Sequence, residues 1–381
     1  MHRNFMTRLL SAILLRSVVS FQPSSSAFII KHNKNHHRLF SVTTMSAFKR
    51  VKLETPTSTK VIGTHSGTFQ ADEAMGVWML RQLPEYRNSK CIRTRDPKIY
   101  DELDIVIDVG GVYDHSKFRY DHHQRDYDER FTPQQCTKLS ASGLIYRHYG
   151  KSVLQQYYPQ LSSTNLDLAY LKLYDTLMEA LDAIDTGVEM VPDGVELVYK
   201  DSTGLASRVS RLNPRWNEDS APETPDERFE IASQICGDEF VSAMTKIIES
   251  DIPAREFVER AVAARMETDA SGEIIRFDSG GLPWRNHLYD IEKEQSIDPL
   301  VKFVLYTDQG GMWRVQAVTV EGRGFENRLS LPEEWRGVRD EELAKVTKIP
   351  GSRFVHAAGF IGGADTYEGA LEMAKVALTR K

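Results

Sequence analysis

Cysteine is scarce in this sequence: 381 residues contain only Cys91, Cys136 and Cys236, which lie far apart. Without a C-x-x-C pair, neither a zinc site built from thiolates nor a disulfide framework is expected. Long apolar runs are also missing, because residues 9–19 are too short a stretch to span a bilayer and contain Arg16. We therefore expect a globular protein of a reducing compartment that does not enter a membrane.

Acidic residues are absent from the N-terminal region. The first is Glu54, and nine Lys or Arg precede it. A leader rich in Arg and Ser that lacks acids is typical of an organellar transit peptide. Residues 1–53 are accordingly predicted to direct the protein to mitochondria, with the plastid as the alternative and a secretory signal as the weaker one. Met45 could provide a second start and a nuclear pool.

The rest of the chain is acidic, with 39 Lys and Arg against 54 Asp and Glu. This balance argues against broad electrostatic binding to nucleic acid, which needs a basic face. It is compatible with an enzyme that holds a few phosphates at a metal centre, because carboxylates repel phosphate until cations occupy them.

Apolar periodicity predicts an α/β domain over residues 55–223. Strands are expected at 60–65, 91–95 and 103–109, and helices at 71–83, 140–149 and 166–183. Their alternation indicates a parallel sheet with crossover helices. A smaller α+β domain is expected over residues 224–381. It would hold a helical region at 225–267 interrupted at Pro253, strands at 273–277, 301–307 and 311–320 with a turn at 308–311, and a helix at 367–378.

Acids and histidines recur at the ends of these predicted elements. Alone, each has an ordinary explanation: histidine pairs are usually exposed, an Asp before glycines forms turns, and acids such as Asp72 and Glu73 complement a helix dipole. Together they supply nitrogen and oxygen ligands for two divalent cations that share one carboxylate, the arrangement used in phosphoryl transfer. The predicted ligands are His65, Asp72, Asp108, His122 and Asp185.

Several ordered motifs resemble a known superfamily. H-S-G-T-F-Q-A-D (65–72), D-V-G-G (108–111), Y-D-H-H-Q (120–124) and D-A-I-D-T-G (182–187) are similar to the DHH phosphoesterases. Residues 63–72, 93–97, 138–146 and 354–363 more closely resemble the exonuclease family named for a melanocyte proliferating gene, and this similarity runs from about residue 58 to 380. The resemblance implies a DHH-type catalytic domain and a Mn²⁺- or Mg²⁺-dependent 3′–5′ exonuclease that acts on single-stranded RNA ends in mitochondria and nucleus.

The resemblance also implies a role for individual residues. His65 and Asp108 would hold one metal ion, and Asp108 would bridge to a second ion held also by Asp72, His122 and Asp185. Asp121 would orient an imidazole from outside the ligand set. His123 would face the scissile phosphate. In the second domain His356 would contact the end of the substrate, although a packed histidine is the plain alternative.

One position departs from the family pattern, which has a histidine where this chain has Gln70. An amide oxygen is a weak neutral ligand, so Gln70 is predicted to reduce affinity at the first metal site. For phosphate contact we favour Arg119 and Arg125, which bracket the Asp-His-His segment and could clamp phosphate oxygens. Gly362 and Gly363 could present main-chain N–H groups to a phosphate, or form a tight turn.

Two other functions fit the same residues. A phosphohydrolase of short oligonucleotides or nucleotides would suit the acidic charge balance. A catalytically weak nucleic-acid-binding protein would suit Gln70, while the other predicted ligands argue against it. Nothing in the sequence fixes the oligomeric state.

Overall fold

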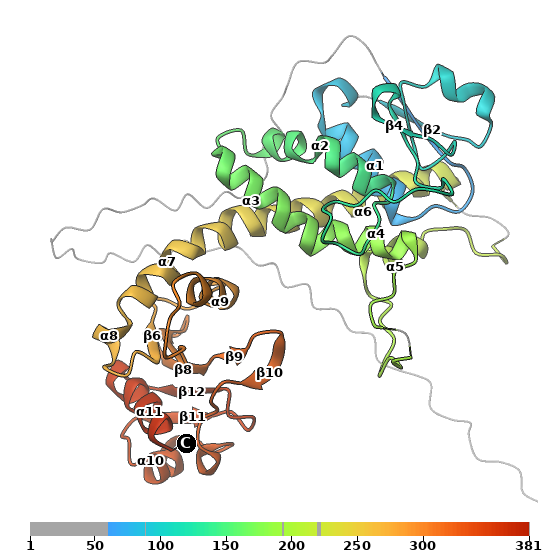
Figure 1. Ribbon diagram of the computed structural model, residues 1–381. Coiled ribbons are helices and arrows are strands. Elements are labelled where there is room, and N and C mark those ends of the chain that lie inside the picture. Colours follow the sequence, from blue (N-terminus) through green and yellow to red (C-terminus); the bar gives the residue numbers. More distant parts are fainter. Residues whose placement is uncertain (1–59, 88, 193, 219–221, 381) are drawn as a thin grey trace, which may run out of the picture. The chain divides into compact units, whose positions relative to one another are not determined.

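A computed structural model describes residues 60–87, 89–192, 194–218 and 222–380 (Figure 1). The predicted leader lies outside these residues. The described chain is mixed α/β, with two five-stranded sheets and one two-stranded sheet. None of the described helices combines the length and the apolar character that a bilayer crossing requires. The three cysteine thiols are free.

The first sheet has the strand order β2-β1-β3-β5-β4. Its strands are β1 (Val61–Thr64), β2 (Lys90–Arg93), β3 (Ile105–Ile107), β4 (Tyr113–Asp114) and β5 (Arg119–Tyr120). β1 pairs in parallel with β2 and β3, and β3 pairs in parallel with β5, whereas β4 is antiparallel at the edge. The carboxyl ends of β1, β3 and β5 therefore meet at one edge of the sheet.

The helices that pack with this sheet are largely buried. The first ten residues of α1 are buried, and α1 contacts both α2 and α6. Trp78 of α1 contacts the ring of Phe240 in α6 at a centroid distance of 5.2 Å. The helices are α1 (Ala71–Gln82), α2 (Ala141–Tyr157), α3 (Ser163–Leu173), α4 (Glu179–Thr186), α5 (Leu205–Ser210) and α6 (Pro225–Thr245), with 3-10 turns at Pro84–Tyr86, Pro97–Glu102 and His115–Lys117.

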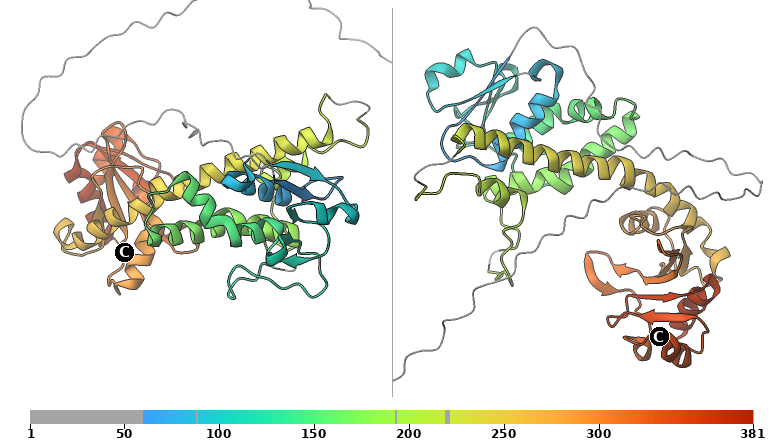
Figure 2. Two further views of the ribbon diagram at one scale, coloured as in Figure 1. Left: turned by 90° about the horizontal axis from the view of Figure 1, so that it is seen from above. Right: turned by 180° about the vertical axis from the view of Figure 1, so that it is seen from behind.

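Two long helices contain a π-helical turn. One turn, Tyr174–Met178, joins α3 to α4, and the other, Lys246–Asp251, joins α6 to α7 (Ile252–Ala263) (Figure 2). The predicted interruption at Pro253 is therefore wrong. Proline lacks an N–H donor and its ring clashes with the carbonyl four residues earlier, and the wider π turn accommodates both defects within a continuous helix.

The second sheet has the order β11-β12-β8-β7-β6 and is antiparallel except where β6 pairs with β7. The turn predicted at residues 308–311 joins β7 to β8, and Asp308 N donates to Met312 O at 2.9 Å. The strands are β6 (Ile274–Arg276), β7 (Phe303–Thr307), β8 (Trp313–Ala317), β11 (Ser352–Val355) and β12 (Ile361–Ala364), while β9 (Thr319–Val320) and β10 (Arg323–Asn327) form the small sheet. The remaining helices are α8 (Arg265–Thr268), α9 (Arg285–Glu294), α10 (Asp340–Thr347) and α11 (Tyr367–Thr379), with a 3-10 turn at Glu333–Trp335.

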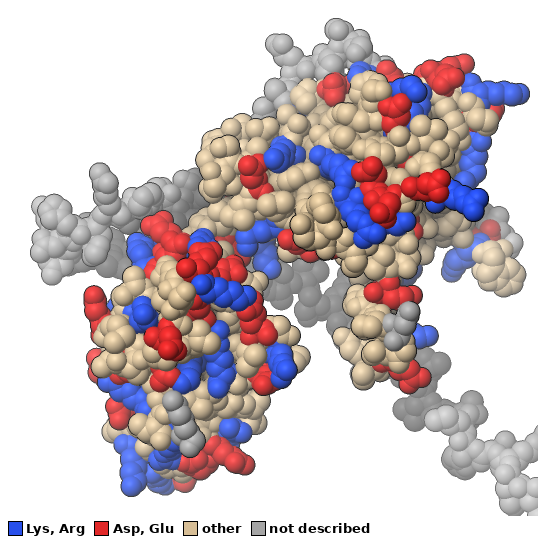
Figure 3. Space-filling view, viewed as in Figure 1, with Lys and Arg blue, Asp and Glu red and all other residues tan. Residues whose placement is uncertain are grey.

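The buried apolar residues form three clusters. One runs from Ile62 to Ile248 and includes most of α6, past the domain boundary predicted at 223/224. The two others lie between Val258 and Ala377 around the second sheet. That the chain divides into two domains stays a prediction. The packing places α6, the first half of the long helix, with the first cluster. On the face drawn in Figure 3, acidic and basic side chains are intermixed.

Candidate metal centre

The carboxyl edge of the first sheet gathers the predicted acids and histidines. His65 follows β1, Asp108 follows β3, and Asp121 with His122 follows β5. Because these three strands are parallel neighbours, the residues that come directly after them lie side by side. The described residues contain groups whose ligand atoms lie within 4.8 Å of one another and could hold a metal ion.

Asp108 occupies the centre of the cluster. Its φ of 55° lies in the left-handed region that non-glycine residues rarely adopt, and Gly110 and Gly111 follow with φ of 101° and 67°. The sharp turn stops the strand and leaves the carboxylate only 5 % exposed. Strained backbone of this kind persists where surrounding structure enforces it, and it is concentrated at functional sites.

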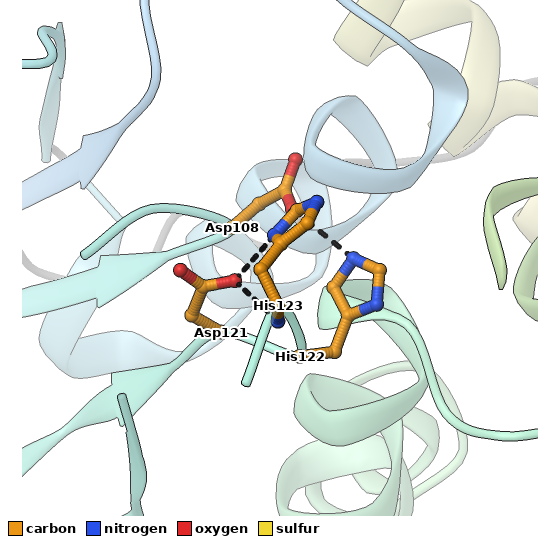
Figure 4. A group of neighbouring side chains, drawn as sticks. All are labelled: Asp108, Asp121, His122 and His123. Carbon is orange, nitrogen blue, oxygen red and sulfur yellow. Dashed lines mark hydrogen bonds and ion pairs between the residues drawn. The ribbon is translucent and has the colours of Figure 1, made fainter. Parts of the chain in front are cut away.

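Asp108 contacts both histidines with different oxygens. Its Oδ2 lies 3.2 Å from His65 Nε2, and its Oδ1 lies 3.4 Å from His122 Nε2. The same His122 nitrogen lies 2.9 Å from Asp185 Oδ2. Asp72, Asp108, His122 and Asp185 form one potential ligand group, so the structure brings these four predicted residues together. Figure 4 shows His122 and His123 beside Asp108.

Glu73 completes a second group, with His65 and Asp108. Its Oε1 lies 3.1 Å from His65 Nε2, and the side chain is fully buried. Gln70 is exposed at the N-cap of α1, and its main-chain N–H donates to Glu73 Oε1 at 2.9 Å. The structure therefore brings Glu73 to this group, while Gln70 is exposed beside it. The sequence interpretation placed Asp72 in the metal site but gave Glu73 only a role toward the helix dipole. It missed that a helix buried from its first turn also turns Glu73 inward.

The burial of this cluster favours cations. Two buried carboxylate oxygens of the cluster, Asp72 Oδ2 and Glu73 Oε2, have no partner among the described residues, whereas Asp108 Oδ1 and His122 Nε2 have each other and Asp185 Oδ2 as their closest ionic partners. Burying the three carboxylates of Asp72, Glu73 and Asp108 together is costly unless their charge is compensated. A donor set of nitrogen and oxygen without sulfur suits Mn²⁺ or Mg²⁺ better than a structural zinc ion. The residues present thus fit divalent metal.

The pKa values reflect the crowding of charge. Burial by itself lowers the pKa of His65 and of His122, but hydrogen bonds with Asp108 and the other carboxylates outweigh it and raise both to about 10. Burial raises the pKa of Asp72 and of Glu73. Burial also acts to raise the pKa of Asp108, but its hydrogen bonds with the two imidazoles hold that pKa below its usual value.

Asp121 holds His123. Its Oδ1 accepts from His123 Nδ1 at 2.6 Å and from the His123 main-chain N–H at 3.1 Å, and its Oδ2 accepts from Gly111 N at 2.5 Å (Figure 4). The His123 side chain is 63 % exposed, and its Nδ1 lies 3.7 Å from Asp108 Oδ1. The ring is thus fixed by its Nδ1 at the mouth of the cluster, with the other nitrogen free of protein partners among the described residues.

A buried network supports Asp72 from behind. Ser140, the N-cap of α2, donates its hydroxyl to Asp72 Oδ1, and the same oxygen accepts from Ser142 N at 2.6 Å. Ser140 Oγ also lies 2.6 Å from Asp182 Oδ1, while Tyr174 OH donates to Asp182 Oδ2 at 2.8 Å. Burial raises the pKa of Asp182 to about 7. The sequence interpretation assigned no role to this set, because local sequence does not show which helix cap faces which acid.

The two arginines predicted to contact phosphate differ in their surroundings. Arg119 donates to the carbonyls of Tyr100 at 2.7 Å and Lys117 at 3.1 Å, so its guanidinium anchors a neighbouring loop. The structure does not bring Arg119 to the metal centre. Arg125 is exposed and has no hydrogen-bond or ionic partner among the described residues.

In the second sheet, His356 is exposed in the β11–β12 connection, where its Nδ1 accepts from Ala358 N at 3.1 Å. Gly362 and Gly363 lie inside β12, paired on both sides by β11 and β8, and not in a turn or at a helix N-terminus. A Cβ on Gly362 would come within 3.1 Å of Phe354 O. Close packing between strands, which the sequence pattern did not reveal, explains these glycines.

Comparison with known proteins places the chain in a family. A family model described as "Uncharacterised protein family (UPF0160)", MYG1_exonuc, matches residues 61–378. The chain belongs to the MYG1 family. It is 46 % identical over 328 residues to the MYG1 exonuclease of Rattus norvegicus, covering 84 % of this chain and 85 % of that protein. No solved structure is significantly similar to it.

Two other MYG1 relatives match an equal or larger share of both chains. The MYG1 exonuclease of Homo sapiens is 45 % identical over 328 residues, which is 84 % of this chain and 86 % of that protein. The MYG1 protein of Saccharomyces cerevisiae is 43 % identical over 340 residues, which is 88 % of this chain and 100 % of that protein. The mammalian relatives are named exonucleases, which implies a nucleic-acid substrate for those proteins.

Proposed function

We propose that this protein is a metal-dependent phosphodiesterase of the DHH type that degrades single-stranded RNA from its 3′ end. One observation carries the proposal: a buried cluster of carboxylates and imidazoles, with polar atoms that lack hydrogen-bond partners, lies at the carboxyl edge of a parallel sheet. The exonuclease names of the MYG1 relatives support the substrate class.

Two groups of side chains would hold two cations, with Asp108 common to both. His65, Glu73 and Asp108 form one group, and Asp72, Asp108, His122 and Asp185 form the other. Mn²⁺ is favoured over Mg²⁺ because each group contains an imidazole. When bound, such a pair of ions lowers the pKa of water and neutralises charge on the attacking and leaving oxygens of a phosphodiester.

The protein's own residues would position the substrate. Asp121 accepts from His123 Nδ1 and thereby fixes the ring orientation, which leaves Nε2 to contact a phosphate oxygen. His123 is therefore proposed as the catalytic residue that faces the scissile phosphate. Arg125, exposed two residues later, is proposed as a phosphate contact. His356 is proposed to contact the substrate end, from the second sheet.

The proposal is tested by digesting a single-stranded RNA 20-mer labelled at its 5′ or its 3′ end, with and without Mn²⁺. We expect a metal-dependent ladder of shortening products from the 5′-labelled RNA and immediate release of mononucleotide from the 3′-labelled RNA. Release of label from the 5′ end first would contradict the polarity. Equal digestion of a DNA 20-mer would contradict the preference for RNA.

The acidic charge balance favours a second candidate, a phosphohydrolase of short oligonucleotides. A dinucleotide and the 20-mer, compared at equal concentration, separate the two candidates. Higher kcat/KM on the dinucleotide would favour the second one. A weak binding protein without catalysis is disfavoured, because Glu73 occupies the group in which Gln70 was expected.

Mitochondrial location is also proposed, from the acid-free leader of residues 1–53. A fluorescent fusion of the full chain would test it. Mitochondrial signal that is lost when the chain starts at Met45 is the expected result, and plastid signal would support the alternative.

A further inference from the structure

A pocket with a volume of about 200 Å³ lies in the second sheet region and shares no residue with the metal centre. The strands β7 and β8 provide one wall, through Tyr306 and Gln316. The loop between β6 and α9 provides the other, through Phe277, Gly280 and Trp284. A cavity of roughly 150 Å³ is enough for benzene, so this pocket has room for one planar heteroaromatic ring.

The loop is shaped to lie directly on the ring of Tyr306. Gly280 N donates to Thr307 O at 2.8 Å, which fastens the loop to the end of β7. A Cβ on Gly280 would come within 2.9 Å of the Tyr306 ring and 2.7 Å of Thr307 O. Glycine is therefore required at this position, and the following Gly281 adopts a φ of 86° that favours glycine as well.

Aromatic side chains give the pocket flat apolar surfaces. Trp284 and Phe277 are 7 % and 6 % exposed, and their ring centroids lie 6.5 Å apart. Tyr306 is half-buried. Trp284 and Phe277 therefore form the apolar floor of the pocket, and Tyr306 is the ring with the most exposed surface. Stacking on an aromatic ring is open to any base and needs no sequence-specific contact.

One hydrogen bond orients the polar group of the pocket. Tyr306 OH donates to Gln316 Oε1 at 2.8 Å, so the amide oxygen is occupied. Gln316 Nε2 has no acceptor among the described residues, and its two N–H groups are available to a ligand. The pocket thus offers a donor to a ring that carries an acceptor, such as the carbonyl oxygen of uracil or guanine.

A positively charged side chain, that of Arg285, lies next to the pocket. The Arg285 guanidinium lies 5.2 Å from the centroid of the Trp284 ring, and this exposed side chain has no acidic partner among the described residues. A ligand that presents a planar ring to the pocket and a phosphate to Arg285 would satisfy both features.

We propose that this pocket binds a nucleobase of the substrate strand, with the base stacked among Trp284, Phe277 and Tyr306, its acceptor bonded to Gln316, and its phosphate near Arg285. The inference rests on the proposed function, because it takes the ligand to be part of a nucleic-acid strand. The pocket would bind the substrate through its bases, whereas the metal centre would act on the phosphodiester backbone.

The experiment measures binding of the full-length protein, with Mn²⁺ present, to two hydrolysis-resistant phosphorothioate strands of equal length. One is 2′-O-methyl oligouridylate, and the other has the same backbone without bases. We expect the oligouridylate to bind about tenfold more tightly, which corresponds to about 1.4 kcal/mol. Gln316→Leu should reduce this preference to less than about threefold, within the range that one base contact contributes.

The matched control is Gln309→Leu, which makes the same replacement at an exposed turn of the same hairpin and should keep the tenfold preference. Arg285→Gln should weaken binding of both strands equally, and Arg260→Gln, an exposed arginine over the ring of Phe257, is its control. If Gln316→Leu does not fold, Tyr306→Phe provides the second variant. It keeps the aromatic ring but removes the hydroxyl that orients the Gln316 amide, so it too should reduce the preference for the oligouridylate. An undiminished preference in Gln316→Leu, or equal binding of the two strands by the wild type, would overturn the proposal.

Failure of the pocket and failure of the proposed function give different results. Hydrolysis of RNA without any preference for bases in binding would reject the pocket and leave the nuclease. A tenfold preference for bases in a protein that hydrolyses no RNA would reject the nuclease and support the pocket as a binding site.

Discussion

The two five-stranded sheets use charge in opposite ways. At the carboxyl edge of the first sheet, carboxylates such as Asp72, Glu73 and Asp108 are buried together and leave polar atoms without partners. Around the second sheet, the buried carboxylates Glu273 and Glu292 each have a basic partner, Lys302 and Arg328, and the pocket is lined mainly by aromatic rings and one amide. Buried charge without compensation is unstable on its own and calls for cations, whereas an aromatic pocket is already complete and suits a flat ligand.

The same contrast appears in the role of arginine. In the second sheet region Arg314 and Arg339 both lie over the Phe354 ring, at 4.8 Å and 5.8 Å from its centroid. In the metal centre, Arg95 approaches His65 Nδ1 at 3.1 Å but no arginine forms an ion pair with the buried carboxylates among the described residues. In the metal-free protein the imidazoles of His65 and His122 are thus the cationic partners of these acids, and bound metal ions would take over that role.

Asp108→Ala should have the largest effect, and only on the site at the first sheet. The variant removes the carboxylate shared by the two ligand groups, so we expect hydrolysis of end-labelled RNA to fall by a factor of at least about a thousand. Binding of the oligouridylate should persist, since it depends on the second sheet. The control is Asp101→Ala, whose side chain is fully exposed 4.0 Å from Arg119. Hydrolysis that survives in Asp108→Ala would reject the proposed mechanism.

Glu73→Gln separates the candidate ligand that the structure adds, Glu73, from the position suspected in the sequence, Gln70. The substitution keeps the shape of the side chain and removes its charge. We expect Mn²⁺ affinity at the site formed by His65, Glu73 and Asp108 to fall by roughly 10- to 100-fold. Gln70→His, which restores the histidine of the family pattern, should change affinity by less than about twofold because Gln70 is exposed. Isothermal titration with Mn²⁺ measures both. A large gain in Gln70→His would return that position to the metal site.

Metal binding should release protons. In the metal-free protein the pKa values of His65 and His122 are raised to about 10, so both rings are protonated at neutral pH and must lose the proton to act as ligands. Mn²⁺ affinity should therefore rise with pH up to about pH 10, by at most roughly tenfold per pH unit for each ring. Titrations at one pH in buffers of different ionisation enthalpy would show the release, and a heat of binding that is the same in all buffers would exclude it.

The free energy of unfolding of the metal-free protein should change with pH in the direction opposite to Mn²⁺ affinity. A histidine whose pKa is raised on folding stabilises the metal-free protein fully below pH 6.5, and this contribution is lost as the pH rises toward 10. Urea unfolding of the metal-free protein should give a decreasing free energy of unfolding over that interval. An increase over the same interval would show that the buried imidazoles are neutral.

Ser140→Ala should have the smallest effect. It removes the hydroxyl between Asp72 and Asp182, so that Asp72 loses one of its two donors and keeps Ser142 N. We expect about tenfold weaker Mn²⁺ binding with the fold intact. Ser140→Thr keeps the hydroxyl and should restore most of the affinity, which a purely structural role would not predict. Unchanged Mn²⁺ binding in Ser140→Ala would show that Asp72 needs no such support.

The sequence was most informative where one strand or one motif defines a residue's place. His65 and Asp108 each lie at the end of a predicted apolar strand, and parallel pairing alone brings such positions together. The short strand β5 before His122 was not predicted, and that histidine was found from its motif. The sequence was less informative about Glu73, because which face of α1 is buried depends on α2 and α6, which come from distant parts of the chain. Ser140 and Asp182 were missed for the same reason, since they are 42 residues apart.

Basic side chains and glycines were the hardest to interpret from sequence. Arg119 stands next to the Asp-His-His segment, yet its strand directs the guanidinium to the carbonyl of Tyr100. Gly362 and Gly363 precede a helix in sequence but pair as a central strand. Proximity along the chain gives no direction for a side chain, and strand pairing with distant residues decided both cases.

The most direct test of the central claim counts metal ions. After equilibrium dialysis against Mn²⁺, the metal content of the full-length protein should be two ions per chain, and Asp108→Asn, which keeps the size of the shared side chain but removes its charge, should retain fewer than one. A wild type that binds no Mn²⁺, or an Asp108→Asn variant that still holds two ions, would contradict the account.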